Sequence, residues 1–146
     1  MKNDKLIKII FYLKDNWHEY LTESLWGKLL SEDTYTIDNI PFFTLDVSCG
    51  DVVKIITKDN QHFFHSLLKR SEHSTYRIVI KNNISDNIVS DLLNNLKLLG
   101  CDYEKGVNNM YAIDVGKNVE VKKLYSLLED GEKKDYWDFE EGCFQH

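Results

Sequence analysis

The first 70 residues alternate short apolar runs with turn residues, a pattern that predicts strands. Residues Leu6–Leu13 are dense in β-branched and aromatic side chains, as buried strands are. The leucines of Tyr20–Leu30 recur at helical spacing, but the following Thr34–Ile37 is typical of a strand. We therefore interpret these two segments as a strand and its partner.

Two turns divide this region. The first is Asp38–Phe43, where Pro41 lacks a backbone donor and forces the residue before it into an extended conformation. The second is Ser48–Asp51, and the strands Val52–Ile56 and Gln61–Leu68 follow it as a hairpin. Residues 1–73 are therefore predicted to form a small antiparallel sheet or barrel.

The period of the apolar residues changes after residue 73. Thr75–Ile80 alternates as a strand, and Ser85 then begins a helix that ends at Gly100. The apolar stripe of this helix consists of Ile88, Leu92, Leu96 and Leu99.

The rest of the chain continues the same architecture. Strands are predicted at Asp102–Glu104, Met110–Val115 and Tyr136–Phe139, and a second helix begins after Asn118 and ends at Asp130-Gly131. Residues 74–146 thus follow the order β-α-β-β-α-β of a ferredoxin-like unit. Since no flexible linker separates the halves, we expect an α+β protein, one compact unit of two lobes, 1–73 and 74–146.

The charge of the chain limits the expected partners. Its 146 residues include 18 Lys+Arg and 24 Asp+Glu, which gives a net charge of −6 and a pI of about 5.3. A surface of this sign repels phosphate, so nucleic acid is not an expected partner. The 42% of hydrophobic residues is enough for a core of ordinary size.

The sequence also bears on the compartment. The N-terminus mixes lysines with apolar residues, unlike a signal peptide, and no apolar run approaches the ~20 residues that cross a bilayer. The three cysteines, Cys49, Cys101 and Cys143, are widely spaced and include no CxxC pair. We expect a cytoplasmic protein with reduced thiols and no membrane partner.

Candidate metal ligands and nucleophiles are isolated from one another. His62 and His65 point to opposite faces of a predicted strand, and no HExxH motif, cysteine cluster or Asp-rich loop accompanies them. We therefore predict no metal site and no cofactor. Cys49 would act as a nucleophile only beside a histidine, and we interpret it as a structural thiol.

One cationic cluster suggests an enzyme. Arg70, His73 and Arg77 are close in sequence, and a histidine between arginines suits phosphodiester cleavage. The same residues would equally pair with the chain's own carboxylates. A small hydrolase or phosphoesterase therefore requires that the three side chains converge in one open cleft.

Two acidic segments carry interleaved aromatic residues, as surfaces that meet a basic protein do. One is Glu129–Glu141 and the other is Asp15–Tyr20. The alternative for the first segment is a solvated tail whose aromatics are buried in the last strand. The candidate partner-binding residues are Asp135, Trp137, Asp138, Glu140 and Glu141 in the first segment and Trp17 and Glu19 in the second.

Several motifs together resemble a bacterial family known only as a domain of unknown function. The motifs are Glu23-Ser24-Leu25-Trp26-Gly27, Asp38-Asn39-Ile40-Pro41-Phe42-Phe43, Gly50-Asp51-Val52-Val53, and the stretches 71–77 and 99–104. The resemblance implies no reaction or ligand, but it marks Asp38, Asn39, Pro41 and Asp51 as positions of interest. From the residues themselves, Asp38 and Asn39 suit bonds to the turn backbone, and Pro41-Phe42 suits a wedge between the lobes.

The sequence favours a binding protein over an enzyme. Small size, net negative charge and the absence of a catalytic motif fit an inhibitor that covers a basic partner, such as the immunity protein of a bacterial nuclease toxin. The alternatives are the hydrolase described above and a dimeric ligand-sensing module that pairs edge strands. The pattern leaves the choice between monomer and dimer open.

Overall fold

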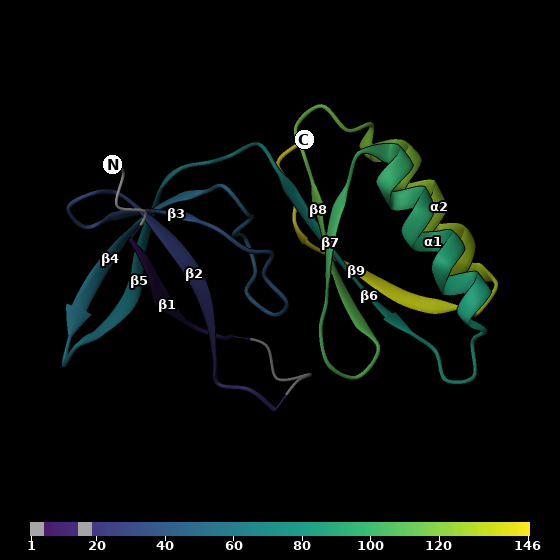
Figure 1. Ribbon diagram of the computed structural model, residues 1–146, viewed down its shortest axis with the longest axis horizontal. Helices are drawn as coiled ribbons and strands as arrows, with labels where there is room; N and C mark the ends of the chain where they lie inside the picture. The colour runs from purple at the N-terminus through teal and green to yellow at the C-terminus, as the bar shows by residue number, and fades with distance from the viewer. Residues whose placement is uncertain (1–4, 15–18) are drawn as a thin grey trace.

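The computed structural model describes residues 5–14 and 19–146, and Figure 1 shows a barrel on one side and a helix-covered sheet on the other. The strands of the barrel are β1 (Leu6–Tyr12), β2 (Thr22–Ser31), β3 (Thr34–Ile37), β4 (Val52–Lys58) and β5 (Gln61–Lys69). Consecutive strands pair antiparallel, and a parallel pairing of β1 with β5 closes the barrel. The interpretation of Tyr20–Leu30 as a strand is confirmed.

The interior of the barrel explains the alternation in its strands. Ile9, Leu25 and Val53 point inward and are fully buried, whereas their neighbours along each strand face outward. Gly27 stands on β2 where a Cβ would overlap the side chain of Ile9. A glycine at this position therefore lets the Ile9 side chain fill the narrow interior.

The second half of the chain forms a four-stranded antiparallel sheet with two helices. Its elements are β6 (Ser74–Ile80), α1 (Asp86–Leu99), β7 (Asp102–Lys105), β8 (Met110–Val115), α2 (Val121–Lys133) and β9 (Trp137–Cys143). The strand order is β7-β8-β6-β9, and both helices lie on one face of the sheet (Figure 1). The predicted α+β class and the β-α-β-β-α-β order are confirmed.

Helix α1 has the predicted bounds. Ser85 is its N-cap residue, and Gly100 ends it in the left-handed region at φ 91°, where its N–H bonds Leu96 and Lys97 carbonyls. Leu92 and Leu96 are buried against the sheet, as the apolar stripe predicts.

The predicted bounds of α2 and of the last strand are wrong. Asn118 does not cap α2, because the chain makes one more turn, closed by the Val119 N–H bond to Gly116 O, before Glu120 takes the N-cap position. Gly131 does not end the helix either, since it lies inside α2, where the Trp137 ring packs against its backbone. The last strand continues beyond Phe139 to Cys143, because β9 pairs with β6 from Thr75 to Ile80.

Candidate functional site

The face of the sheet opposite the helices is covered by the loop between β3 and β4, residues 38–51. Alternate residues of β6 point to this face, so Thr75 and Arg77 meet the loop rather than the helices. The Thr75 and Ser48 hydroxyls are 2.6 Å apart, and Arg77 Nη1 donates to the Pro41 and Thr44 carbonyls at 3.2 and 3.1 Å. The loop therefore joins the barrel to the sheet.

Glu23 on β2 holds the same loop from the barrel side. Its carboxylate accepts hydrogen bonds from the N–H groups of Phe42, Phe43 and Thr44 at 2.7–3.1 Å, and from the Thr44 hydroxyl at 2.6 Å. These bonds satisfy three successive backbone donors that no strand or helix pairs. The Glu-Ser-Leu-Trp motif thus has a structural role at its first residue.

Asn39, Pro41 and Asp51 among the predicted motif residues also have structural roles, whereas the Asp38 side chain is exposed. Asn39 Oδ1 accepts the Trp26 N–H at 2.8 Å, and Pro41 is buried. Asp51 is fully buried and accepts from Ser48 N, Ser71 N and the Gln145 side chain at 2.8–3.3 Å. Asp38 is exposed, and its backbone N–H bonds Trp26 O at 2.8 Å.

The cationic cluster does not assemble. Arg77 is 1% exposed and pairs with Glu140 at 2.9 Å, and its Nη2 has no acceptor among the described residues. His73 Nδ1 pairs instead with Asp114 at 2.9–3.0 Å. Arg70 points to the end of the barrel, with Cys143 Sγ at 3.9 Å from Nη1. Separate partners therefore hold the three side chains, and the condition for a hydrolase site is not met.

Cys49 lies in an environment that suppresses its reactivity. Burial, followed by the negative charges of Asp114 and Asp38, raises the pKa of the Cys49 thiol to about 12. The thiol therefore stays protonated at neutral pH, and its Sγ lies 3.8 Å from the Ile37 carbonyl. This placement agrees with a structural thiol.

The two strand histidines have separate neighbours. His62 Nδ1 lies 3.0 Å from the Thr57 hydroxyl, and His65 Nδ1 lies 3.1 Å from the Ser66 hydroxyl. Within residues 5–14 and 19–146, no three His, Cys, Asp or Glu side chains are grouped as a metal site requires.

The C-terminal acidic segment divides into core and surface residues. Trp137 is 4% exposed and donates from Nε1 to Leu128 O at 2.9 Å, so its assignment to a partner surface is wrong: the ring fills the space between α2 and the sheet. Glu141 accepts the Tyr76 hydroxyl at 2.8 Å. Asp135 and Asp138 both pair with Lys81, at 3.6 and 3.1 Å, and remain exposed.

An open groove lies between the lobes beside these residues. Val79 on β6 stands between Met110 on β8 and Asp138 on β9. Val79 and Met110 line both a hollow of about 170 Å³ and a hollow of about 550 Å³, so the two hollows are neighbours that share these two residues. We call them together the interlobe groove; its lining includes Glu19, Tyr20, Phe43, Val79, Val107, Met110, Asp138 and Glu140.

The groove brings together parts of the two predicted binding segments. Glu19 and Tyr20 lie just before β2, whereas Asp138 and Glu140 lie on β9, at the other end of the chain. Glu19 and Tyr20 line one hollow together with Val107 and Asn108 of the turn between β7 and β8. Trp17 lies outside the described residues.

Sequence reasoning missed the apolar floor of this groove. Val79 is 38% exposed and lies on the face of β6 that also carries Thr75 and Arg77. Because the other two residues of that face are polar, the alternation along β6 gives no signal of an apolar floor.

The comparisons with known proteins agree with this architecture. A crystal structure titled as a novel structure of a hypothetical protein from Neisseria gonorrhoeae has 21% sequence identity and a TM-score of 0.81, over 100% of this chain and 99% of that one. This likeness shows a shared fold. The comparison with curated proteins found no match.

The part of the chain that the structure describes contains no helix long and apolar enough to cross a membrane.

The model of a family described as a domain of unknown function, DUF4265, matches residues 23–139, a span that contains Glu23, the 38–51 loop and Arg77. The chain therefore belongs to the DUF4265 family.

Proposed function

We propose that this protein is an acidic inhibitor of a basic protein, such as the immunity protein of a bacterial nuclease toxin. The basic partner binds in the interlobe groove. One observation carries the proposal: two acidic–aromatic segments from opposite ends of the chain line neighbouring hollows that share Val79 and Met110. Val79 and Met110 supply an apolar floor, and Glu19 and Asp138 supply carboxylates at its edges. An apolar centre with charges around it is the usual anatomy of a protein interface.

The charges of the groove suit a cationic partner. Asp138 is 67% exposed, and its Lys81 partner is itself a surface lysine. Because exposed ion pairs contribute little stability, a lysine or arginine of the partner exchanges with Lys81 at small cost. Glu140 is held by the buried Arg77, so Glu19 and Asp138 are the carboxylates available for steering.

The first test asks whether this chain binds and neutralises one defined candidate partner. The chain is coexpressed with the product of the adjacent gene, and complex formation and rescue of growth are measured. We expect a stable complex and restored growth. A partner that is toxic, but neither binds this chain nor is neutralised by it, would overturn the proposal.

The position of the interface is tested with matched variants. The double variant Glu19→Gln, Asp138→Asn should lower the association rate several-fold at low salt and flatten its salt dependence, because charges at an interface edge act on the on-rate. The control pair Glu120→Gln, Asp130→Asn removes two exposed carboxylates around α2, away from the groove. Equal rates for the two double variants would place the interface elsewhere.

The apolar floor has a separate test. Val79→Arg puts a bulky cation at an exposed position of β6, so it should block the complex while leaving the melting temperature near that of the unsubstituted chain. Full affinity of a folded Val79→Arg variant would contradict a contact in the groove.

A further inference from the structure

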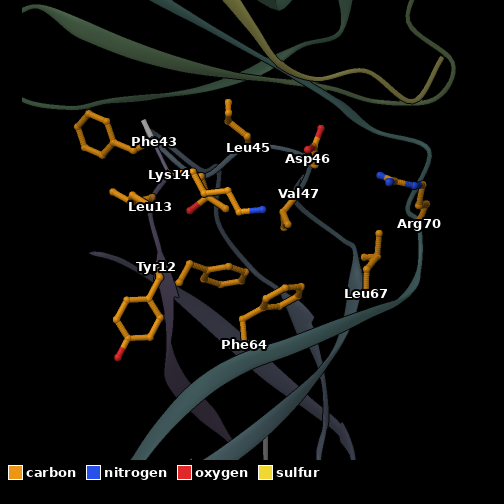
Figure 2. Close-up of a pocket in the computed structure, with 12 residues that line it drawn as sticks. Tyr12, Leu13, Lys14, Phe43, Leu45, Asp46, Val47, Phe64, Leu67 and Arg70 are labelled. Atoms are coloured by element: carbon orange, nitrogen blue, oxygen red, sulfur yellow. The ribbon is translucent and has the colours of Figure 1, made fainter. Parts of the chain in front are cut away.

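A second cavity lies at the end of the barrel. It has a volume of about 430 Å³, between the barrel strands and residues 43–47 of the loop above them. Phe11 and Phe64 stack at its floor with ring centroids 4.8 Å apart, and Figure 2 shows Val47 and Leu67 on the side facing Arg70. This volume is in the range of small-molecule sites.

The cover of this cavity is fixed from two directions. Glu23 binds the N–H and the hydroxyl of Thr44, and the Asp46 N–H donates to the Gly142 carbonyl on β9 at 3.0 Å. The loop is thus tied both to the barrel and to the sheet. Because these ties hold it above the barrel end, the cavity does not close by collapse of the loop onto Phe11 and Phe64, although protein interiors otherwise pack closely.

The charges of the lining differ from those of the whole molecule. Two cations, Lys14 and Arg70, reach toward each other from opposite sides in Figure 2, and Asp46 is the one carboxylate of the lining. Neither cation forms an ion pair with a carboxylate among residues 5–14 and 19–146, and the contact of Arg70 is to a sulfur at 3.9 Å. The lining therefore has a net charge of +1 in a chain whose net charge is −6.

We infer that this cavity is a binding site for a small apolar monocarboxylate, of the class of medium-chain fatty acids. The apolar body lies over Phe11 and Phe64, and the carboxylate lies between Lys14 and Arg70 at the rim. A single negative charge matches the net charge of the lining, whereas Asp46 disfavours a doubly charged phosphate. This inference does not depend on the proposed inhibitor function, because it uses a different opening and different charges.

The test titrates decanoate into the isotope-labelled protein and follows amide shifts together with calorimetry. We expect saturable one-to-one binding, with shifts confined to the residues of the lining. 1-Decanol, which has the same chain without the charge, should bind at least about tenfold more weakly, the effect of a charge-assisted contact. Absence of binding up to about 1 mM decanoate, or equal affinity for decanol, would overturn the inference.

Variants separate the cavity from general surface binding. Arg70→Gln and Lys14→Gln should each weaken decanoate binding several-fold without changing decanol binding. Lys69→Gln is the matched control, since Lys69 is exposed, adjacent in sequence and outside the lining. Decanoate affinity that falls equally in Lys69→Gln, or that is unchanged in both rim variants, would contradict the site.

The last test uses a variant whose side chain fills the cavity. Leu67→Trp places a large ring in the cavity and should abolish binding of both probes. If this variant does not fold, the exposed rim positions still decide the question, because Arg70 and Lys14 contribute no side chain to the core. Shifts at Glu19, Val79 and Asp138 instead of the barrel residues would assign the probe to the interlobe groove and overturn the inference.

Discussion

At the scale of single residues, burial decides what reactive side chains do in this protein. Cys49, His73 and Arg77 are the residue types of catalytic sites, yet each is held by a structural partner or by burial. The same polar chemistry that activates a nucleophile in an open cleft satisfies backbone or carboxylate groups here. Arg77 therefore holds the loop to the sheet, His73 binds Asp114 on β8, and the Cys49 thiol contacts the end of β3.

The reactivity of Cys49 tests this view. Because its pKa is raised from 9.0 to about 12, its thiolate population below pH 9 is about a thousandfold smaller than in the unfolded chain. Alkylation by iodoacetamide at pH 8, followed residue by residue by mass spectrometry, should be slower in the native protein by at least that factor. In denaturant all three cysteines should react at ordinary rates.

The same pKa gives a dependence of stability on pH. The unfolded thiol loses its proton first, so the contribution of Cys49 to stability is full below pH 9.0 and is lost as the pH rises toward about 12. Cys49→Ala should flatten this alkaline loss in urea titrations. Rapid alkylation of native Cys49 at pH 8 would contradict both expectations.

At the scale of elements, the packing of α2 against β9 overrides local propensity. Gly131 lies in the last turn of α2, where glycine is a poor helix former and sequence rules place a helix end. A Cβ at this position would overlap the Trp137 ring, which is itself fixed by its bond to Leu128 O. The glycine thus serves the contact between helix and strand, and the helix continues through it.

Gly131→Ala should therefore destabilise the protein even though alanine favours the helix. We expect a loss of about 2 kcal/mol in the free energy of unfolding, from overpacking against the indole, measured by urea denaturation. Gly116→Ala is the control, because its Cβ would meet only Val119 Cγ2 at 4.0 Å, and it should stay within about 0.5 kcal/mol. A stabilised Gly131→Ala variant would mean that the ring moves aside without cost.

At the scale of the whole molecule, residues 38–51 form the contact through which the barrel and the sheet become one unit. Glu23 holds this loop from the barrel, and Arg77 holds it from the sheet. The loop also separates the interlobe groove from the cavity at the barrel end, and Phe43 lines both. The two candidate sites therefore depend on the same few hydrogen bonds.

Glu23→Gln should lower the thermal stability of both lobes together. The amide offers one acceptor oxygen where the carboxylate offers two, so at least one buried donor loses its partner, at a cost of about 1.5–3 kcal/mol. We expect a lower melting temperature, with barrel and sheet unfolding in one transition. Glu32→Gln, at the exposed turn between β2 and β3, is the control. Two separate transitions in Glu23→Gln would show that the lobes fold independently of the loop.

Much of this fold follows from the sequence by itself. The alternation of β1 and β6, the stripe and glycine end of α1, and the change of period after residue 73 are local patterns, so the order of elements and the α+β class could be predicted. The net charge and the two acidic–aromatic segments also follow directly from the sequence.

Only the tertiary structure decided which of these residues meet. Trp137 is in the core rather than at the surface because α2 packs on β9, and Glu23 binds a loop some twenty residues away in sequence. The interlobe groove and the cavity at the barrel end are each lined by residues that lie far apart in the sequence. Such contacts depend on closure of the barrel and on the position of the loop, and no local periodicity encodes either one.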